Sequence, residues 1–147
     1  MTSAPSVDGQ IIGQAHYATR AVLESLLATT GTTFHQALAL NALAARGGTA
    51  DRSWLVARLT TGLKIDAATA EEVLASLTAS GLLTASADDG ARLGFTEAGQ
   101  ERQAAIADGT AKIVAPLYAD LPAEDLATTA RILLTLTERA DKALASA

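Results

Sequence analysis

Cysteine is absent from this 147-residue sequence, and aromatic side chains make up only 3% of it. The first absence excludes disulfides, thiolate catalysis and cysteine-ligated zinc or iron–sulfur centres. The second means that the core has to be built from leucine, alanine, valine and isoleucine. Alanine and leucine lose little conformational entropy in a helix, so this composition favours a helical protein. With 49% apolar and 18% charged residues, the chain has the composition of a globular domain.

The first residues do not resemble a leader segment, and long hydrophobic runs are absent from the sequence. Residues 1–8 have neither the basic start nor the apolar stretch of a signal peptide. No segment approaches the roughly 18 uninterrupted apolar residues that a membrane span requires. We therefore expect a cytoplasmic protein that makes no contact with a membrane.

Motifs of known catalytic chemistry are lacking as well. There is no glycine-rich phosphate loop, no His-Glu-x-x-His and no Gly-x-Ser-x-Gly. The acid pairs Glu71-Glu72 and Asp88-Asp89 are adjacent in sequence, so their side chains point apart and do not resemble a general acid–base couple. The sequence therefore predicts a protein that is not an enzyme and that uses no cofactor or metal.

Hydrophobic periodicity predicts a series of helices separated by glycine, serine and threonine. Thr33, Asp66 and Thr96 are placed to cap three of them, and Pro122 stands where the last one begins. Residues 82–86 and 91–95 flank an Asp-Gly turn, so they are expected to form a β-hairpin. The predicted helices cover residues 10–29, 34–46, 52–61, 66–80, 97–118 and 122–144.

Short helices followed by a hairpin make a winged helix-turn-helix. The expected fold is mostly α with a small β-hairpin wing, in a single domain over residues 1–147 whose winged-helix part covers about 34–95. The remaining helices, at about 10–29 and 97–145, carry apolar stripes that so small a body cannot cover. We expect these to be dimerisation helices that pair with a second copy of the chain.

Two stretches of the sequence resemble the MarR family of bacterial regulators. Val73–Leu83 is similar to that family's recognition helix and first wing strand, and Ala91–Gly99, which closes in Thr-Glu-Ala-Gly, is similar to the second wing strand and the start of the next helix. The resemblance covers about residues 10–145. It implies a homodimeric transcription regulator whose recognition helix and wing contact operator DNA. It also implies that the protein releases its DNA, as many members do, when a small aromatic ligand enters a crevice between the dimer helices and the winged domain.

The chain departs from the MarR pattern where DNA would be touched. The family usually has arginine in its recognition helix and wing tip, whereas here the helix carries Glu71 and Glu72 and the wing keeps only Arg92. Residues 66–101 hold one base against seven acids, a net charge of −6, so the rest of the chain carries +1 of the total of −5. The turn before the recognition helix, at Thr60–Ile65, also looks longer than the family's tight turn. Because phosphate neutralisation supplies most of the affinity of such proteins, this acidity opposes ordinary operator binding.

The predicted DNA-binding set combines the family's DNA-facing positions with nearby basic side chains. Bases cluster at Arg46, Arg52, Arg58 and Lys64, where they could hold phosphates. Glu71 and Glu72 could read bases, since a glutamate can accept a hydrogen bond from cytosine N4, or they could be solvent-facing acids in a first helical turn, where Thr69 and Glu72 have capping-box spacing. Arg92 is either a groove contact of the wing or a charge that protects a strand edge. The predicted contacts are Arg52, Lys64, Ala68, Thr69, Glu72, Ser76 and Arg92.

His16, Tyr17 and His35 are the predicted ligand-binding residues, because the first and second helices border the effector crevice in the family and these side chains are aromatic with polar tips. The two histidines have no metal-ligand spacing. Phe34 and Trp54 are expected to fill the core.

Two functions follow from these observations. In the first, the chain is a MarR-like homodimer that binds double-stranded DNA and is modulated by a small aromatic ligand. In the alternative, the fold is kept but ordinary DNA binding is lost, which leaves a small-molecule-binding or protein-interaction module.

Overall fold

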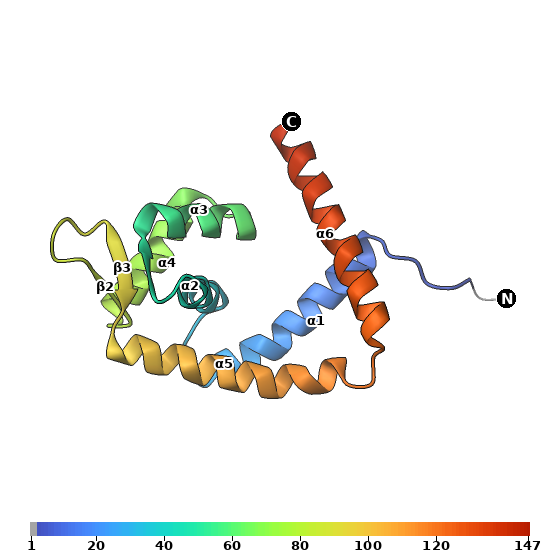
Figure 1. Cartoon of the computed structure of the whole chain (residues 1–147), viewed down its shortest axis with the longest axis horizontal. Coiled ribbons are helices and arrows are strands. Elements are labelled where there is room, and N and C mark those ends of the chain that lie inside the picture. The colour runs from blue at the N-terminus through green and yellow to red at the C-terminus, as the bar shows by residue number, and fades with distance from the viewer. Residues whose placement is uncertain (1–2) are drawn as a thin grey trace. The chain divides into compact units, whose positions relative to one another are not determined.

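The computed structural model describes residues 3–147 and contains helices and one small sheet (Figure 1). The expected class, mostly α with a β-hairpin wing, is confirmed. The elements in chain order are α1 (Gly9–Ala28), α2 (Phe34–Ala45), β1 (Thr49–Asp51), α3 (Arg52–Leu63), α4 (Ala67–Ala79), β2 (Leu83–Ala85), β3 (Arg92–Phe95), α5 (Glu97–Tyr118) and α6 (Ala123–Ala145).

The chain forms two compact units, one ending at Ile113 and the other covering Val114–Ala147. The first unit holds α1 to β3 and most of α5, and the second holds the end of α5 and all of α6. The division lies close to Pro116, which stands inside α5. Proline has no N–H to donate to the preceding turn, so α5 is locally weakened at this point.

Side-chain caps set the helix starts where the sequence predicted them. Thr33 and Gln36 form a complete capping box on α2, with Gln36 N donating to Thr33 Oγ1 over 3.1 Å and Thr33 N donating to Gln36 Oε1 over 2.9 Å. Asp66 caps α4 by accepting from Thr69 N at 2.7 Å, and the hydrogen bonds from Thr69 hold the pKa of Asp66 below its ordinary value. The suggested capping box of Thr69 with Glu72 is wrong, because α4 begins earlier and Thr69 already lies inside it.

The sheet has three antiparallel strands in the order β1-β3-β2. The predicted hairpin is confirmed as β2 and β3, and Figure 1 shows it projecting beside α4. Gly90 in its turn has a φ of 70°, which glycine adopts without strain. The strand β1 was not predicted, and it pairs with β3 so that Ala50 lies opposite Leu93 and Asp51 opposite Arg92.

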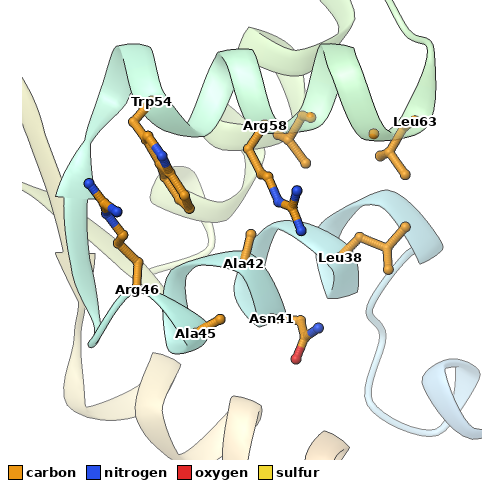
Figure 2. Close-up of a pocket in the computed structure, with 10 residues that line it drawn as sticks. Leu38, Asn41, Ala42, Ala45, Arg46, Trp54, Arg58 and Leu63 are labelled. Carbon is orange, nitrogen blue, oxygen red and sulfur yellow. The ribbon is translucent and has the colours of Figure 1, made fainter. Parts of the chain in front are cut away.

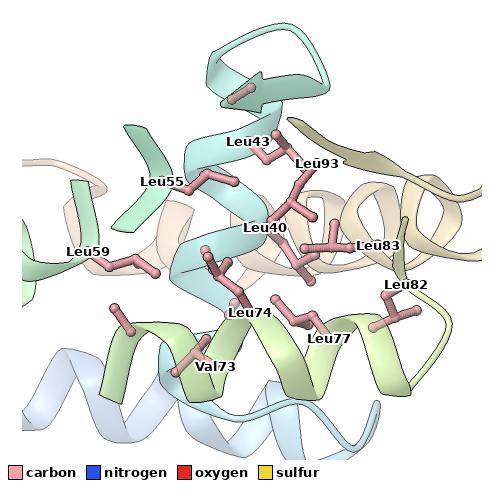
Figure 3. Packing of buried hydrophobic residues seen from close by; sticks show 14 of the residues in the cluster. Leu40, Leu43, Leu55, Leu59, Val73, Leu74, Leu77, Leu82, Leu83 and Leu93 are labelled. Atoms are coloured by element: carbon pink, nitrogen blue, oxygen red, sulfur yellow. The ribbon is translucent and has the colours of Figure 1, made fainter. Parts of the chain in front are cut away.

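The core of the first unit lies where α2, α3, α4 and the sheet meet (Figure 3). On α4 the apolar positions that follow the helical repeat, Ala70, Val73, Leu74 and Leu77, are all buried. Leu43, Leu55 and Leu59 are buried as well. Trp54 is half-buried against this cluster, whereas Phe34 lies outside it, so its expected core role is wrong. The fully buried large side chains are Leu27, Leu40, Leu43, Leu55, Leu74, Leu77 and Leu93.

The turn between α3 and α4 is short. Helix α3 continues to Leu63 and α4 starts at Ala67, which leaves only Lys64, Ile65 and Asp66 between them. The long turn expected over Thr60–Ile65 is therefore wrong. Lys64 reverses the chain in a left-handed conformation with a φ of 57°, which ends α3 at once. The pair α3–α4 thus has the tight turn of a helix-turn-helix.

Helix α6 has no buried residue along its whole length. Its apolar side chains include Leu133 and Leu136, with exposed fractions of 38% and 39%, and Leu144, with 62%. Polar residues occupy the other side of the helix, so α6 is strongly amphipathic.

Candidate nucleic-acid interface and ligand clefts

Helix α4 presents mostly small side chains and two glutamates to solvent. Ala68 and Glu72 are exposed, while Thr69 and Ser76 are half-buried. Ser76 is turned toward α2, where its Oγ accepts a hydrogen bond from Gln36 Nε2 at 2.9 Å. Of the four α4 residues predicted to touch DNA, Ala68 and Glu72 are thus the ones most open to a partner.

Arg52 begins α3 and is held by Glu71 of α4. Its Nε and Nη2 both donate to Glu71 Oε2, over 2.8 Å and 2.7 Å. Their side chains stay 37% and 46% exposed, so the ion pair lies at the surface. Two of the residues that the sequence placed on the DNA-facing side are therefore bound to each other.

Arg92 lies on β3 and reaches across the sheet to β1. Its Nη1 donates to Asp51 Oδ1 at 2.9 Å, and its Nη2 donates to Thr49 Oγ1 at 3.4 Å. The Asp51–Arg92 register explains this contact, because directly opposed side chains in antiparallel strands lie close together. The wing arginine is thus exposed but already paired with a carboxylate.

The wing loop adds further negative charge. Asp89 Oδ1 accepts from Ala91 N at 2.9 Å and from Ser86 Oγ at 3.2 Å, and these bonds hold the pKa of Asp89 below its ordinary value. Asp89 is therefore ionised at neutral pH and fixes the turn.

Lys64, another of the predicted DNA contacts, lies in the turn before α4. Its Nζ donates to Thr61 O at 2.6 Å.

A cleft of about 500 Å³ lies between α2 and α3 (Figure 2). Arg46 places its guanidinium carbon 4.7 Å from the centre of the Trp54 ring, and Arg58 points into the same cleft. No carboxylate within residues 3–147 pairs with either arginine. Its other lining residues are mostly apolar: Leu38, Asn41, Ala42, Ala45, Leu59, Gly62 and Leu63.

Sequence reasoning assigned the bases of this cleft to phosphate contacts and missed the cleft itself. The usable signal was the pair Arg46 and Arg58 on successive helices with Trp54 between them. Together these groups offer two cationic donors, an aromatic face and an apolar wall, which is the chemistry that binds an aromatic anion.

Two of the three predicted ligand residues, His16 and His35, have their rings next to Phe34, and Tyr17 lies beside His16. The ring of His16 lies 5.3 Å from that of Tyr17 and 6.5 Å from that of Phe34, whose ring in turn lies 6.1 Å from that of His35. Arg20 stacks over Phe34 at 4.0 Å. Tyr17 remains 70% exposed, so the cluster is a surface patch.

A second pocket of about 470 Å³ adjoins this patch and includes Phe34 and His35. Its other wall is α4, through Thr69, Glu72 and Ser76. Arg20, its one arginine, is already ion-paired with Glu24 at 3.3 Å. His16 and Tyr17 do not line it.

None of the helices within residues 3–147 is long and apolar enough to cross a lipid bilayer. The same residues contain no group of three or more histidine, aspartate or glutamate side chains arranged to hold a metal ion.

No protein-family model and no curated protein sequence matches the chain, but solved structures do. The transcriptional regulator PA3341 is similar with a TM-score of 0.76 and 20% identity, over 91% of this chain and 98% of that one. A MarR-family transcriptional regulator from Silicibacter pomeroyi gives a TM-score of 0.68 at 16% identity, over 86% and 84%. BpsR of Bordetella bronchiseptica, whose DNA binding is regulated by 6-hydroxynicotinic acid, gives 0.69 at 19% identity, over 91% and 99%.

These likenesses cover almost the full length of each chain at low sequence identity. The expected resemblance is thereby confirmed at the level of architecture: the chain has a MarR-like winged-helix fold.

Proposed function

We propose that this chain is a homodimeric, DNA-binding transcription regulator whose activity is modulated by a small aromatic anion. The observation that carries the proposal is the MarR-like fold, with its tight α3–α4 turn and its β2–β3 wing. In this function α4 enters the major groove and the wing lies along the backbone. The proposed DNA contacts remain Arg52, Lys64, Ala68, Thr69, Glu72, Ser76 and Arg92.

The first experiment is selection of bound duplexes from a random or genomic DNA pool at low salt, followed by salt titration of the enriched sequence. A regulator of this kind enriches a site with two related half-sites, and its affinity falls with salt as phosphate contacts release counterions. Absence of enrichment at low salt contradicts DNA binding.

The α2–α3 cleft is the proposed effector site. Its two arginines have no carboxylate partner within residues 3–147, whereas Arg20 of the other pocket is paired with Glu24. The regulation of BpsR by 6-hydroxynicotinic acid supports an aromatic acid as the class of ligand. His16, Tyr17 and His35 stand as proposed ligand contacts of a second site, in which His35 lines the pocket and His16 and Tyr17 belong to the adjoining surface patch.

Replacing Arg58 with glutamine is expected to weaken binding of 6-hydroxynicotinic acid or benzoate about tenfold, because one charge-assisted hydrogen bond is lost. Trp54→Ala should weaken it by a similar factor. Isothermal calorimetry measures both. His35→Ala and Arg20→Gln are the matched variants of the second pocket and should leave this affinity unchanged. If they abolish binding and Arg58→Gln does not, the effector site lies at α1 and α2.

The alternative function keeps the dimer and the cleft without DNA binding, and the net charge of −6 over residues 66–101 favours it. Glu72 separates the two functions, because it is exposed on α4 and no hydrogen bond or ion pair holds it within residues 3–147.

In a regulator, Glu72→Gln is expected to change base preference at one position of each half-site from cytosine to adenine, because glutamine pairs with adenine N6 and N7. The wild-type and variant selections are compared at the same salt concentration. Glu101→Gln, on exposed α5, carries the same charge change and should leave base preference unaltered. A uniform gain of affinity for all sequences in Glu72→Gln supports the alternative function instead.

A further inference from the structure

Four charged side chains form two ion pairs at the corner of the first unit that the proposed function turns toward DNA. Glu71 binds Arg52 through two contacts of 2.8 Å and 2.7 Å, and Asp51 binds Arg92 at 2.9 Å. The two pairs are joined through the backbone, because Arg52 N donates to Ala91 O at 2.7 Å. We call these four residues, Asp51, Arg52, Glu71 and Arg92, the paired corner.

The fold itself brings each acid to its arginine from another element. Strand β1 ends at Asp51 and α3 begins at the next residue, so the antiparallel register with β3 sets Arg92 against Asp51. Helix α4 packs beside α3 and carries Glu71 to Arg52. The acids therefore come from β1 and α4, and the arginines from α3 and β3.

A DNA phosphate approaching this corner meets two guanidinium groups that each already bind a carboxylate. To take over the N–H groups that hold the carboxylate, it has to displace that carboxylate, which is then left next to the phosphate. The four side chains are between 37% and 60% exposed, so the ion pairs are weak enough to exchange. The freed carboxylate also recovers a cation from solution, which offsets part of the counterion release that drives DNA binding.

We propose that Asp51 and Glu71 are internal competitors for DNA phosphate, which hold the affinity and the salt dependence of this protein below those that Arg52 and Arg92 would give alone. DNA binds by exchange of carboxylate for phosphate at the paired corner. This inference rests on the proposed DNA-binding function. It means that the acidic side chains of this surface, through Asp51 and Glu71, lower the affinity for DNA.

The test measures affinity for the duplex enriched by the wild-type protein, and for a random-sequence duplex, over a range of salt concentrations. Asp51→Asn and Glu71→Gln should each tighten binding about threefold, and the double variant about tenfold, which corresponds to the strength of exposed ion pairs. The slope of log affinity against log salt should steepen by about one for each released arginine. Glu101→Gln carries the same change of charge at an exposed carboxylate that forms no ion pair with an arginine within residues 3–147, and it should change affinity little.

A double-mutant cycle shows whether the arginine is the intermediary. In an Arg52→Gln background, Glu71→Gln should no longer tighten binding, because there is no guanidinium left to release. If the gain persists there, Glu71 acts by general repulsion and the proposal is overturned. If the wild type binds DNA and neither Asp51→Asn nor Glu71→Gln changes its affinity, the proposal is overturned but the DNA-binding function stands. If neither the wild type nor the double variant binds either duplex at low salt, the proposed function fails together with the inference.

Discussion

Replacing Gly99 with alanine is expected to destabilise the protein by about 3 kcal/mol, because a side chain at this position has no room. An added Cβ would overlap the carbonyl oxygen of Leu82, and it would lie 2.9 Å from the carbonyl carbon of Leu82 and 3.2 Å from Phe95 Cδ1. The carbonyl belongs to the backbone between α4 and β2, so it cannot rotate away as a side-chain end can. Thermal unfolding should show a midpoint roughly 10 °C lower than that of the wild type.

Local hydrogen bonds show why this position is fixed. Thr96 Oγ1 donates to Gly81 O at 2.6 Å and accepts from Gly99 N at 3.0 Å. One hydroxyl therefore ties the end of α4 to the start of α5, and it draws the first turn of α5 onto Leu82. In the Thr-Glu-Ala-Gly stretch, Thr96 thus makes the hydrogen bonds between the end of α4 and the start of α5, and Gly99 leaves room for the Leu82 backbone to pack there.

Two other helical glycines serve as matched controls. A Cβ at Gly13 in α1 would meet nothing within 4 Å, so Gly13→Ala should stabilise the protein by about 0.5–1 kcal/mol through helix propensity. A Cβ at Gly109 would meet the Leu26 methyl groups at 2.9 Å and 3.0 Å, which can move, so Gly109→Ala should have a small effect. A Gly99→Ala protein that melts as high as Gly13→Ala would contradict the steric account.

Helix boundaries were predictable from the sequence because caps are local. The side chains of Thr33 and Asp66 contact backbone groups three residues ahead, so the few residues that define a helix start stand together in the sequence. Burial on α4 was predictable for the same reason, since its apolar positions follow the helical repeat.

Contacts between distant segments were not predictable in this way. Strand β1 has three residues and exists because β3 pairs with it. The two strands are far apart in the sequence: Arg92 of β3, whose Nη2 donates to Thr49 of β1, lies forty-three positions after it. Glu71 looked like a solvent-facing acid because its partner Arg52 lies nineteen positions away. The sequence predicted the acidity of the DNA-facing surface, but only the packing of α4 against α3 shows that these acids neutralise the arginines beside them.

The same difference between local and distant contacts explains which candidate ligand residues were predicted. His16, Tyr17 and His35 were grouped because they are aromatic with polar tips and stand on the two helices that border the crevice in the resembling family, and the rings of His16 and His35 lie next to Phe34. The α2–α3 cleft was missed because Arg46 and Trp54 are separated by β1 and meet only when the two helices pack together. The hydrophobic periodicity of a single helix does not predict such a contact between two helices.

Charged substitutions on the apolar side of α6 are expected to convert the proposed homodimer to monomers. A helix of 23 residues with no buried side chain gains little from propensity alone, so its stability has to come from a partner surface. Leu133 and Leu136 lie on its apolar stripe, and glutamate at both positions would place two negative charges in the proposed interface. Sedimentation equilibrium of Leu133→Glu/Leu136→Glu should give the mass of one chain. The wild type should give the mass of two.

The same variant links dimerisation to DNA binding. A monomer can hold only one half-site, so its affinity for the selected duplex should fall about a hundredfold or more as the effective concentration of the second half is lost. Ala127→Glu/Leu134→Glu adds the same charge to the opposite side of α6, where Leu134 is 70% exposed, and it should leave mass and affinity unchanged. If both variants sediment as dimers, α6 is not the interface. If the wild type is itself monomeric, the unburied stripe of α6 serves another partner, and the two-half-site mode of DNA binding is excluded for the isolated chain.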